Sequence, residues 1–461
     1  MADFDGLPAR QRFWSALAIW IALTMAVLDG AIANVALPTI ARELSATPDQ
    51  SIWVVNGFQL AVVVSLLPLA ALGEMIGYRR VFLGGIVLFT LASLGCALAH
   101  SFPVLVFARV VQGLGSAGIM SVNGALLRFS YPARLLGRGV GMNALVVSAA
   151  AAFGPTVASG ILALGPWQWL FAVNVPIGIL AVLVGREALP SSPTSGRLDL
   201  ASTLLNVATF GLGFTGVDAL TQGDLRRGGV EVALAVMTGV ALLLRSRAQP
   251  TPLVPIDLLR NRIFALSVTT SIASFAAQTL AFVSLPFYLQ GVLHRDQVAT
   301  GLLMTPWPLA AGIAATVAGR SADRFPAAIL AGAGLAVLAL GLLSLALLPA
   351  DAGAQAIAWR MAVCGLGFGF FQAPNNRTML SSAPLARSGA AGGMLATARL
   401  TGQTIGATVA AISFRFAADA EPFALAIAAL FAAGAAGASL WRLRRASSAP
   451  PGAPRPVADA L

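Results

Sequence analysis

Long apolar stretches recur along the whole chain, and they limit what it can fold into. Hydrophobic residues make up 57% of the 461 residues, and charged residues only 10%, against about 25% in a typical soluble domain. The 29 basic and 18 acidic residues are too few to cover the surface of a water-soluble protein of this size. Lipid must therefore surround most of the surface. This excludes a soluble globular enzyme, a disordered chain, a collagen and a disulfide scaffold.

The apolar stretches are long enough to cross a bilayer, since a spanning helix needs roughly 20 mostly apolar residues. Fourteen spans are predicted, at 14–37, 51–72, 81–100, 103–127, 139–163, 168–189, 198–218, 229–245, 263–290, 299–319, 327–349, 355–380, 389–413 and 422–441. The eighth is the weakest, because it is short and Glu231 lies at its start. A twelve-span protein, with 198–245 as a surface hairpin, remains the alternative.

The basic residues are all arginine, and their positions predict the orientation of the spans. With the N-terminus inside, 21 arginines lie in inside segments and only five in outside loops. This asymmetry follows the positive-inside rule, so both termini are expected in the cytoplasm. The net charge of +11 then reflects topology, and no nucleic-acid partner is expected. The outside arginines are Arg42, Arg226, Arg227, Arg295 and Arg415, and those within spans are Arg109, Arg360 and Arg399.

Metal, cofactor and enzyme chemistry have little support in the sequence. The two cysteines, Cys96 and Cys364, both lie in apolar runs, so neither a disulfide framework nor a metal cluster is implied. The two histidines, His100 and His294, lie at outside ends of spans and cannot form an HExxH site. We therefore expect no metal, no cofactor and no enzymatic activity.

Two stretches of the chain resemble each other across an offset of eight spans. Arg109–Gly115 in span 4 is similar to Arg360–Gly367 in span 12, and Gly73–Arg80 after span 2 is similar to Gly319–Arg324 after span 10. Such repeats are common in transporters with a site near the bilayer midplane. The predicted divisions are a cytoplasmic N-terminus at 1–13, an N-terminal six-helix half at 14–190, an inserted helix pair with flanking loops at 191–262, a C-terminal six-helix half at 263–445 and a disordered cytoplasmic tail at 446–461.

Six short motifs, in order and with this topology, resemble those of the fourteen-span drug:proton antiporters of the major facilitator superfamily. They are Leu28–Pro38, Ala70–Arg80, Arg109–Gly113, Gly154–Gly160, Trp167–Gly178 and Leu285–Gln290. The resemblance extends from about residue 14 to about residue 440. The second motif departs from the family pattern, with Ala70 in place of Gly, Glu74 in place of Asp and Met75 in place of a basic residue.

The resemblance implies an all-α membrane protein with the major facilitator fold, two six-helix halves and an inserted pair. It implies a monomeric multidrug exporter of the bacterial inner membrane, embedded in the lipid bilayer, that exchanges protons for an amphipathic or lipophilic small molecule by alternating access. Export of an endogenous metabolite, a siderophore or a lipid on the same fold is one alternative. A membrane binding or scaffold protein that does not transport is another.

Asp29 is the only carboxylate predicted deep within a span. A charge at membrane depth costs about 2.5–3.5 kcal/mol on insertion scales, so such a group usually binds a proton, an ion or a partner arginine. The sequence predicts that Asp29 carries the exchanged proton, and the resemblance implies that Arg109 modulates it. Arg399, near the middle of span 13, could bind an anionic group or hold Asp29 in place. A permanent ion pair between Asp29 and either arginine is the structural alternative.

The loop motifs predict a gate at the cytoplasmic ends of the helices. Glu74 is expected to pair with arginines such as Arg79 and Arg80 when the inside is closed, and to release them on opening. Asp323 and Arg324 would act in the same way in the second half. The alternative is that all five are solvated charges at helix ends.

Gly154 and Pro155 in span 5 match the motif associated with antiporters and are expected to form a hinge or leak barrier between the halves. The alternative is an ordinary proline kink. Polar and aromatic residues within spans are expected to line the substrate cavity, since apolar walls with a few polar groups suit a lipophilic ligand. These residues are Asn34, Trp53, Asn56, Gln59, Asn143, Gln278, Trp307, Phe371, Asn375 and Gln403.

Overall fold

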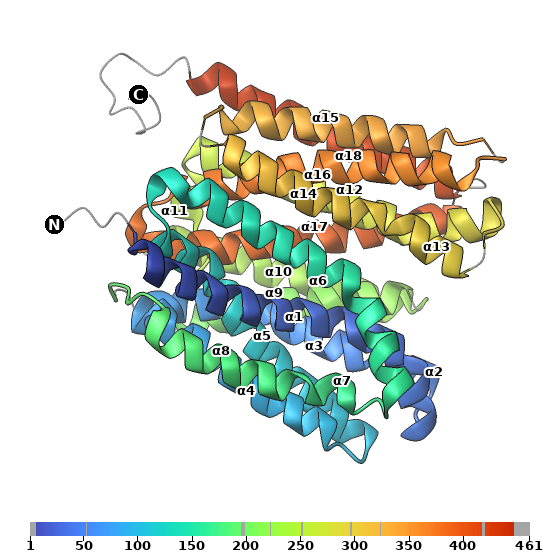
Figure 1. Ribbon diagram of the computed structural model, residues 1–461, viewed down its shortest axis with the longest axis horizontal. Helices are drawn as coiled ribbons and strands as arrows, with labels where there is room; N and C mark the ends of the chain where they lie inside the picture. Colours follow the sequence, from blue (N-terminus) through green and yellow to red (C-terminus); the bar gives the residue numbers. More distant parts are fainter. Residues whose placement is uncertain are drawn as a thin grey trace.

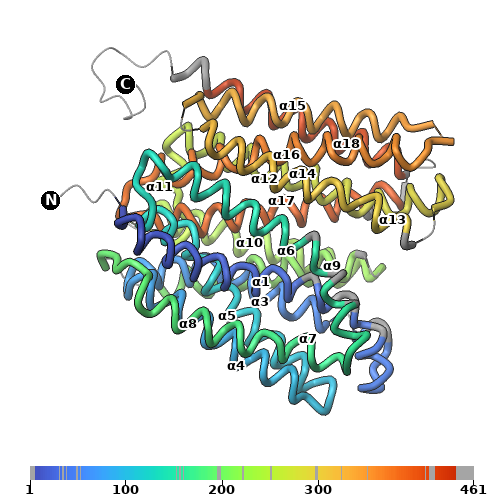
Figure 2. Tube along the Cα trace, in the orientation of Figure 1, coloured from blue at the N-terminus to red at the C-terminus, as the bar shows by residue number. Residues whose placement is uncertain are grey.

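The computed structural model is a bundle of long helices whose axes lie roughly along one line (Figures 1 and 2). It describes residues 6–51, 53–194, 199–221, 223–249, 252–295, 297–322, 324–349, 351–416 and 420–446, and none of these residues lies in a β-strand. A helix satisfies its backbone donors and acceptors within itself, which is what lipid requires of a spanning segment.

The helices follow one another with short connections. The first part of the chain forms α1 (Ala9–Glu43), α2 (Pro48–Ser51), α3 (Trp53–Ile76), α4 (Tyr78–Ala97), α5 (Phe102–Ser130), α6 (Leu136–Leu164), α7 (Trp169–Ala172) and α8 (Asn174–Ala188). The middle forms α9 (Leu200–Thr221), α10 (Leu225–Arg247) and α11 (Ile256–Leu259). The last part forms α12 (Arg262–Phe287), α13 (Gln297–Met304), α14 (Pro306–Ser321), α15 (Ala327–Ala346), α16 (Ala354–Ser382), α17 (Ser388–Phe416) and α18 (Ala420–Ala446). Single turns are η1 (Ala133–Leu135), η2 (Tyr288–Val292) and η3 (Leu385–Arg387).

The number of spans differs from the prediction. Twelve helical segments of the described chain are long and apolar enough to cross a membrane, and α9 and α10 are among them. The predicted spans 139–163 and 389–413 are not; they lie in α6 and α17, two 29-residue helices packed within the bundle. The count of fourteen is therefore not supported.

Two large hydrophobic clusters form the interior. One joins α1, α3, α4, α5 and α8 around side chains such as Phe82 and Phe89, and the other joins α12 to α18 around side chains such as Trp307 and Leu338. Figure 1 shows α4 and α8 at one side of the bundle and α15 and α18 at the other. The first and last parts of the chain thus each bury their own apolar surface. The division limits given above remain a prediction, and residues 447–461 of the tail lie outside the described chain.

The repeated motifs occupy equivalent places. Helix α5 packs on α3 and α4 as α16 packs on α14 and α15. A Cβ on Gly113 would lie 2.5 Å from the Phe58 backbone oxygen, and a Cβ on Gly365 would lie 2.2 Å from the Trp307 backbone oxygen. These glycines therefore allow backbones to approach closely, as small residues do in membrane helix pairs.

The hairpin of α9 and α10 lies at the periphery. Only 17% of the residues in each of these spans are buried, against 33% or more in the other ten, and α9 packs on α3. The Arg245 guanidinium closes the hairpin by donating hydrogen bonds of 2.8 and 3.0 Å to the Asp199 carboxylate. These bonds hold the pKa of Asp199 well below its usual range.

The glycine contacts predict a stability effect. A Cβ on Gly115 would lie 2.5 Å from the Phe89 backbone nitrogen, whereas Gly84 on α4 has no atom within 4 Å of its Cβ position. We expect Gly115→Ala to destabilise the protein by about 1–3 kcal/mol, because overpacking forces helices apart. Gly84→Ala is the matched control and should leave the melting temperature unchanged or slightly raised. Equal melting temperatures for the two purified variants would contradict the close approach of α4 and α5.

Candidate functional site

A cavity with a volume of about 470 Å³ lies between the two groups of helices. Its walls come from α1, α3, α5 and α6 on one side and from α12, α14, α16 and α17 on the other. Most of the lining is apolar, and it includes five aromatic side chains: Phe58, Phe275, Phe282, Trp307 and Phe368. This size and character suit a drug-sized amphipathic molecule, since ligand pockets measure about 300–1,000 Å³.

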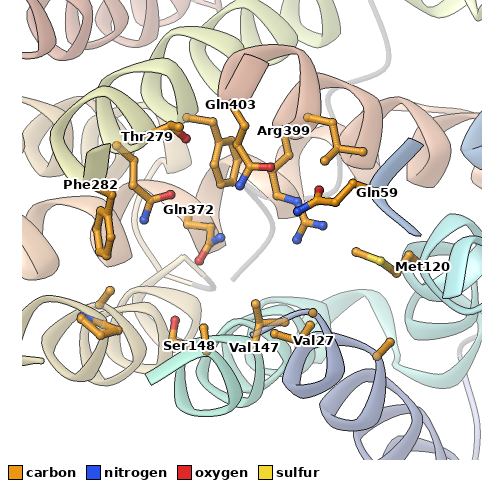
Figure 3. Close-up of a pocket in the computed structure, with 18 of the residues that line it drawn as sticks. Val27, Gln59, Met120, Val147, Ser148, Thr279, Phe282, Gln372, Arg399 and Gln403 are labelled. Carbon is orange, nitrogen blue, oxygen red and sulfur yellow. The ribbon is translucent and has the colours of Figure 1, made fainter. Parts of the chain in front are cut away.

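Polar side chains are gathered mainly on one wall of the cavity. Figure 3 shows Gln372, Gln403 and Arg399 near one another, with the Arg399 guanidinium directed into the pocket beside Gln59. Val147 and Ser148 of α6 lie across from them. The cavity thus has an apolar, aromatic body and a polar wall with a single arginine.

Four predicted cavity residues line this cavity: Gln59, Gln278, Trp307 and Gln403. Asn143 lines an adjoining smaller cavity of about 70 Å³, to which Arg399 and Gln372 also contribute. Gln372 lines both cavities and was not predicted.

Two predicted cavity residues serve packing instead. Asn56 donates a 3.5 Å hydrogen bond to Asp218 and so joins α3 to the peripheral α9. Buried Asn375 donates to the Ser267 backbone oxygen at 3.1 Å and accepts from Arg442 at 3.0 Å, within the second half. Both side chains form their hydrogen bonds with neighbouring helices and not at the cavity. Their position within a predicted span was therefore not enough to predict that they line the cavity.

The remaining predicted cavity residues do not line the cavity. Phe371 is fully buried and packs on Phe368 with ring centroids 5.7 Å apart. Trp53 begins α3, is partly buried, and is absent from the described lining of both cavities. The side chain of Asn34 lies outside the described part of the chain.

Asp29 and Arg109 form an ion pair in the interior of the first half. Arg109 Nη1 lies 2.5 Å from Asp29 Oδ2, and the two side chains are at most 1% exposed. The other Asp29 oxygen accepts hydrogen bonds from Gln112 at 2.9 Å and Asn174 at 2.8 Å. Arg109 Nε donates to the Val54 backbone oxygen at 2.8 Å. Helices α5 and α8 therefore neutralise and solvate this carboxylate of α1, as a buried charge requires, and α3 holds Arg109 in place.

Phe58 contacts both this ion pair and the cavity. Its ring centroid lies 4.3 Å from the Arg109 guanidinium carbon, a cation–π distance, and the same residue lines the cavity. Asp29 itself does not line either described cavity, although its neighbours Gly30 and Val27 do. Arg399 makes no described contact with Asp29, so the structure brings together only one of the two predicted pairs.

A second charge cluster joins the two halves at one end of the bundle. Both the start of α1 and the end of α18 lie at this end, on the left in Figure 1 together with α11, and we call it the terminal end. Arg387 of η3 donates at 2.8 Å to Glu74 of α3 and makes two 3.1 Å bonds to Asp257 of α11. Glu74 also accepts from the Ala390 backbone at 2.8 Å. Burial lowers the pKa of Arg387, but the hydrogen bonds and charges of Asp257 and Glu74 outweigh it and raise the pKa overall.

The gate pairing predicted from the sequence is therefore wrong in its partners. Arg79 donates to the Arg186 backbone oxygen, and Arg80 donates to the Ile76 backbone oxygen at 3.2 Å. Neither makes a described contact with Glu74, and both follow the helix break at Gly77, whose φ of 102° redirects the chain. Arg324 is exposed at the turn after α14, and Asp323 lies outside the described residues.

The predicted hinge lies inside α6. Gly154 is buried in this continuous helix, and the side chain of Pro155 is outside the described part of the chain. Closer to the terminal end, α6 packs tightly on α14, where a Cβ on Gly141 would lie 2.8 Å from the Ala315 backbone oxygen.

Sequence reasoning missed Gln112, Asn174, Arg387 and Asp257. Gln112 and Asn174 lie within two of the motifs quoted above, so the motifs marked their positions but not their contacts. No group of three or more histidine, cysteine or acidic side chains in the described chain could hold a metal ion.

Comparison with known proteins agrees with this architecture. The family model described as Major Facilitator Superfamily matches residues 19–407. A relative in Escherichia coli (strain K12), named Uncharacterized transporter YebQ, is 50% identical over 96% of this chain and 98% of its own. Multidrug resistance protein Stp of Mycobacterium tuberculosis (strain CDC 1551 / Oshkosh) is 31% identical over 87% of this chain and 75% of its own. A solved structure of the proton:xylose symporter XylE has a TM-score of 0.66 at 16% identity, covering 95% of this chain and 96% of that one.

The helical bundle, its central cavity and these relatives define a multi-pass membrane transporter rather than an enzyme. The chain belongs to the Major Facilitator Superfamily, whose model matches most of its length.

The contact between Glu74 and Arg387 predicts a gate that opens at the terminal end. Glu74→Gln weakens one hydrogen bond between charged groups, worth about 1.5–3 kcal/mol, and should shift the closed-to-open equilibrium by about 10- to 100-fold. Arg387→Gln also removes the two bonds to Asp257 and should shift it at least as far. Spin labels at the exposed positions Arg134 and Arg324 would report this opening as a longer distance between the halves, measured by double electron–electron resonance spectroscopy. Transport should fall while substrate binding is retained.

Arg80→Gln is the matched control for the gate, because Arg80 bonds only within its own neighbourhood and is exposed. A distance distribution in Glu74→Gln like that of Arg80→Gln would show that this cluster does not hold the terminal end closed.

Proposed function

We propose that the protein is a secondary active exporter that exchanges protons for an amphipathic or lipophilic compound by alternating access. The buried pair of Asp29 and Arg109, one aromatic ring away from the central cavity, carries this proposal. A charge at membrane depth costs at least about 2.5 kcal/mol, so a scaffold protein without transport would have little use for it. The relative named as a multidrug resistance protein supports the proposal that the exported compound is drug-like.

The proposed proton step is a competition for one carboxylate. In this conformation Arg109, Gln112 and Asn174 occupy the oxygens of Asp29. Movement of α1 relative to α5 would separate the pair and let a proton replace Arg109. Phe58 would control access, because it lies over the guanidinium and lines the cavity.

The proposed substrate step uses the cavity between the halves. The cluster of Glu74, Arg387 and Asp257 closes one end, and rigid-body rocking of the halves would open it. We further propose that α6 and α17 also cross the bilayer, which would give fourteen spans in two six-helix halves with α9 and α10 as an inserted pair. The terminal end would then be cytoplasmic in a bacterial inner membrane, and the protein would act as a monomer.

The orientation can be measured directly. A reporter fused after Arg445 should be cytoplasmic, and one inserted near Gln222 should be on the opposite side, because the inside segments hold 21 arginines against five outside. A cytoplasmic reporter at Gln222 would remove α9 and α10 from the set of spans, and a periplasmic reporter at Arg445 would reverse the proposed orientation.

The coupling role of Asp29 predicts that Asp29→Asn abolishes uphill export and substrate-induced proton release in proteoliposomes. Asparagine keeps the shape and removes the titration. It also leaves Arg109 buried without its anion, and breaking a buried pair costs about 3–5 kcal/mol. A size-exclusion profile and a melting curve should therefore accompany the assay.

Asp218→Asn is the matched control for coupling, since Asp218 is a carboxylate on the peripheral α9 that accepts a hydrogen bond from Asn56. This variant should retain proton release. Proton release by folded Asp29→Asn at the level of Asp218→Asn would place the exchanged proton elsewhere and leave Asp29 as a structural counter-ion.

A further inference from the structure

Arg399 differs from every other arginine of the bundle interior in its surroundings. Arg109 has Asp29, and Arg442 donates to Ser267, Asn375 and Ser439. Arg399 makes no hydrogen bond and no ion pair with any described residue, and its Nε is buried without a partner. Its side chain nevertheless lines both cavities and points into the larger one (Figure 3).

The cavity offers Arg399 no anion of its own. Among the residues that line the two described cavities there is no aspartate or glutamate, so Arg399 is the only charged side chain. A buried guanidinium without a counter-charge is costly, and it has five donors in a planar fork that matches carboxylate and phosphate groups. The missing partner is therefore expected to arrive with the ligand.

From this geometry we infer that the transported compound is an amphipathic organic anion whose carboxylate or equivalent group binds Arg399. This inference rests on the proposed function and names the substrate class of the same cavity. The anionic head would lie on the polar wall, where Gln59, Gln372 and Gln403 add hydrogen-bonding groups around Arg399. The apolar body would lie against Phe275, Phe282, Phe368 and Trp307.

The volume of about 470 Å³ favours a free small anion over a membrane lipid. It lies within the range of drug-sized pockets, whereas a phospholipid with two acyl chains would not fit. Arg399 also has no described contact with Asp29, so binding an anion there leaves the proposed proton site intact. An anion at Arg399 and a proton at Asp29 would thus use separate residues of the same cavity region.

The test compares two probes of nearly the same size and shape: N-dansyl-phenylalanine, a carboxylate, and N-dansyl-phenylalaninamide, a neutral carboxamide. Equilibrium binding to the protein in phosphatidylcholine nanodiscs is followed by dansyl fluorescence. We expect the carboxylate to bind about 10- to 100-fold more tightly, the range that a hydrogen bond to a charged group contributes. Arg399→Gln should abolish this preference, and Arg399→Lys should restore part of it.

Arg360→Gln is the matched control, because Arg360 is also an arginine within a span but lies over Trp359 and donates to the Ala356 backbone oxygen. It should keep the preference for the carboxylate. Equal affinities for the two probes in the unmodified protein, no saturable binding of the carboxylate, or a preference that survives Arg399→Gln would each overturn the inference. Loss of the preference in discs that contain phosphatidylglycerol would overturn the assignment to a free anion.

These measurements need no gradient, so they separate the inference from the proposed function. Arg399-dependent anion binding without proton-coupled export would retain the inference and remove the exporter mechanism. Proton-coupled export of a cationic amphipath, with no preference for the dansyl carboxylate, would retain the exporter mechanism and remove the inference.

Discussion

A carboxylate buried in a lipid-surrounded bundle must be given a cation and hydrogen-bond donors, and the first half of this protein is arranged around meeting that need at Asp29. The charge of Arg109 comes from α5, together with the amide of Gln112, while α8 contributes the amide of Asn174. Helix α3 fixes Arg109 through the Val54 backbone oxygen. These contacts tie α1 to α5 and α8, and α5 to α3, so any movement of α1 that exposes Asp29 must break its bonds to α5 and α8.

The second half repeats the packing of the first without repeating its chemistry. Glycines at equivalent places let α16 approach α14 and α15 as α5 approaches α3 and α4. The equivalent arginine, Arg360, has no acid among its described contacts and lies over Trp359. The charge that faces the cavity from this half is instead Arg399. The two halves are thus suited to different tasks, with a neutralised pair in one and an unneutralised cation in the other.

The sequence indicated which residues carry charge in the interior and at helix ends more readily than it indicated the partners of each charge. The sequence placed Arg109 within a span, and in the structure it is buried and followed by glycines that approach neighbouring helices closely. Glu74 is one of the predicted gate residues, and in the structure its partner is Arg387, which lies 313 residues away. The nearest arginines, Arg79 and Arg80, were the natural expectation from the sequence, yet beyond the break at Gly77 they donate to backbone oxygens instead.

By itself the sequence determined that the chain is a helical membrane protein with an internal repeat and a buried Asp29. Apolar length, arginine distribution and motif order depend on the solvent around each segment, and that solvent is dictated residue by residue. Only the tertiary structure decided which polar residues face the cavity. Gln59 and Gln403 line it, while Asn56 and Asn375 form hydrogen bonds to neighbouring helices. All four lie within helices and look alike in sequence. Their roles depend on how each helix is rotated about its axis, and that rotation is set by packing against helices from distant parts of the chain.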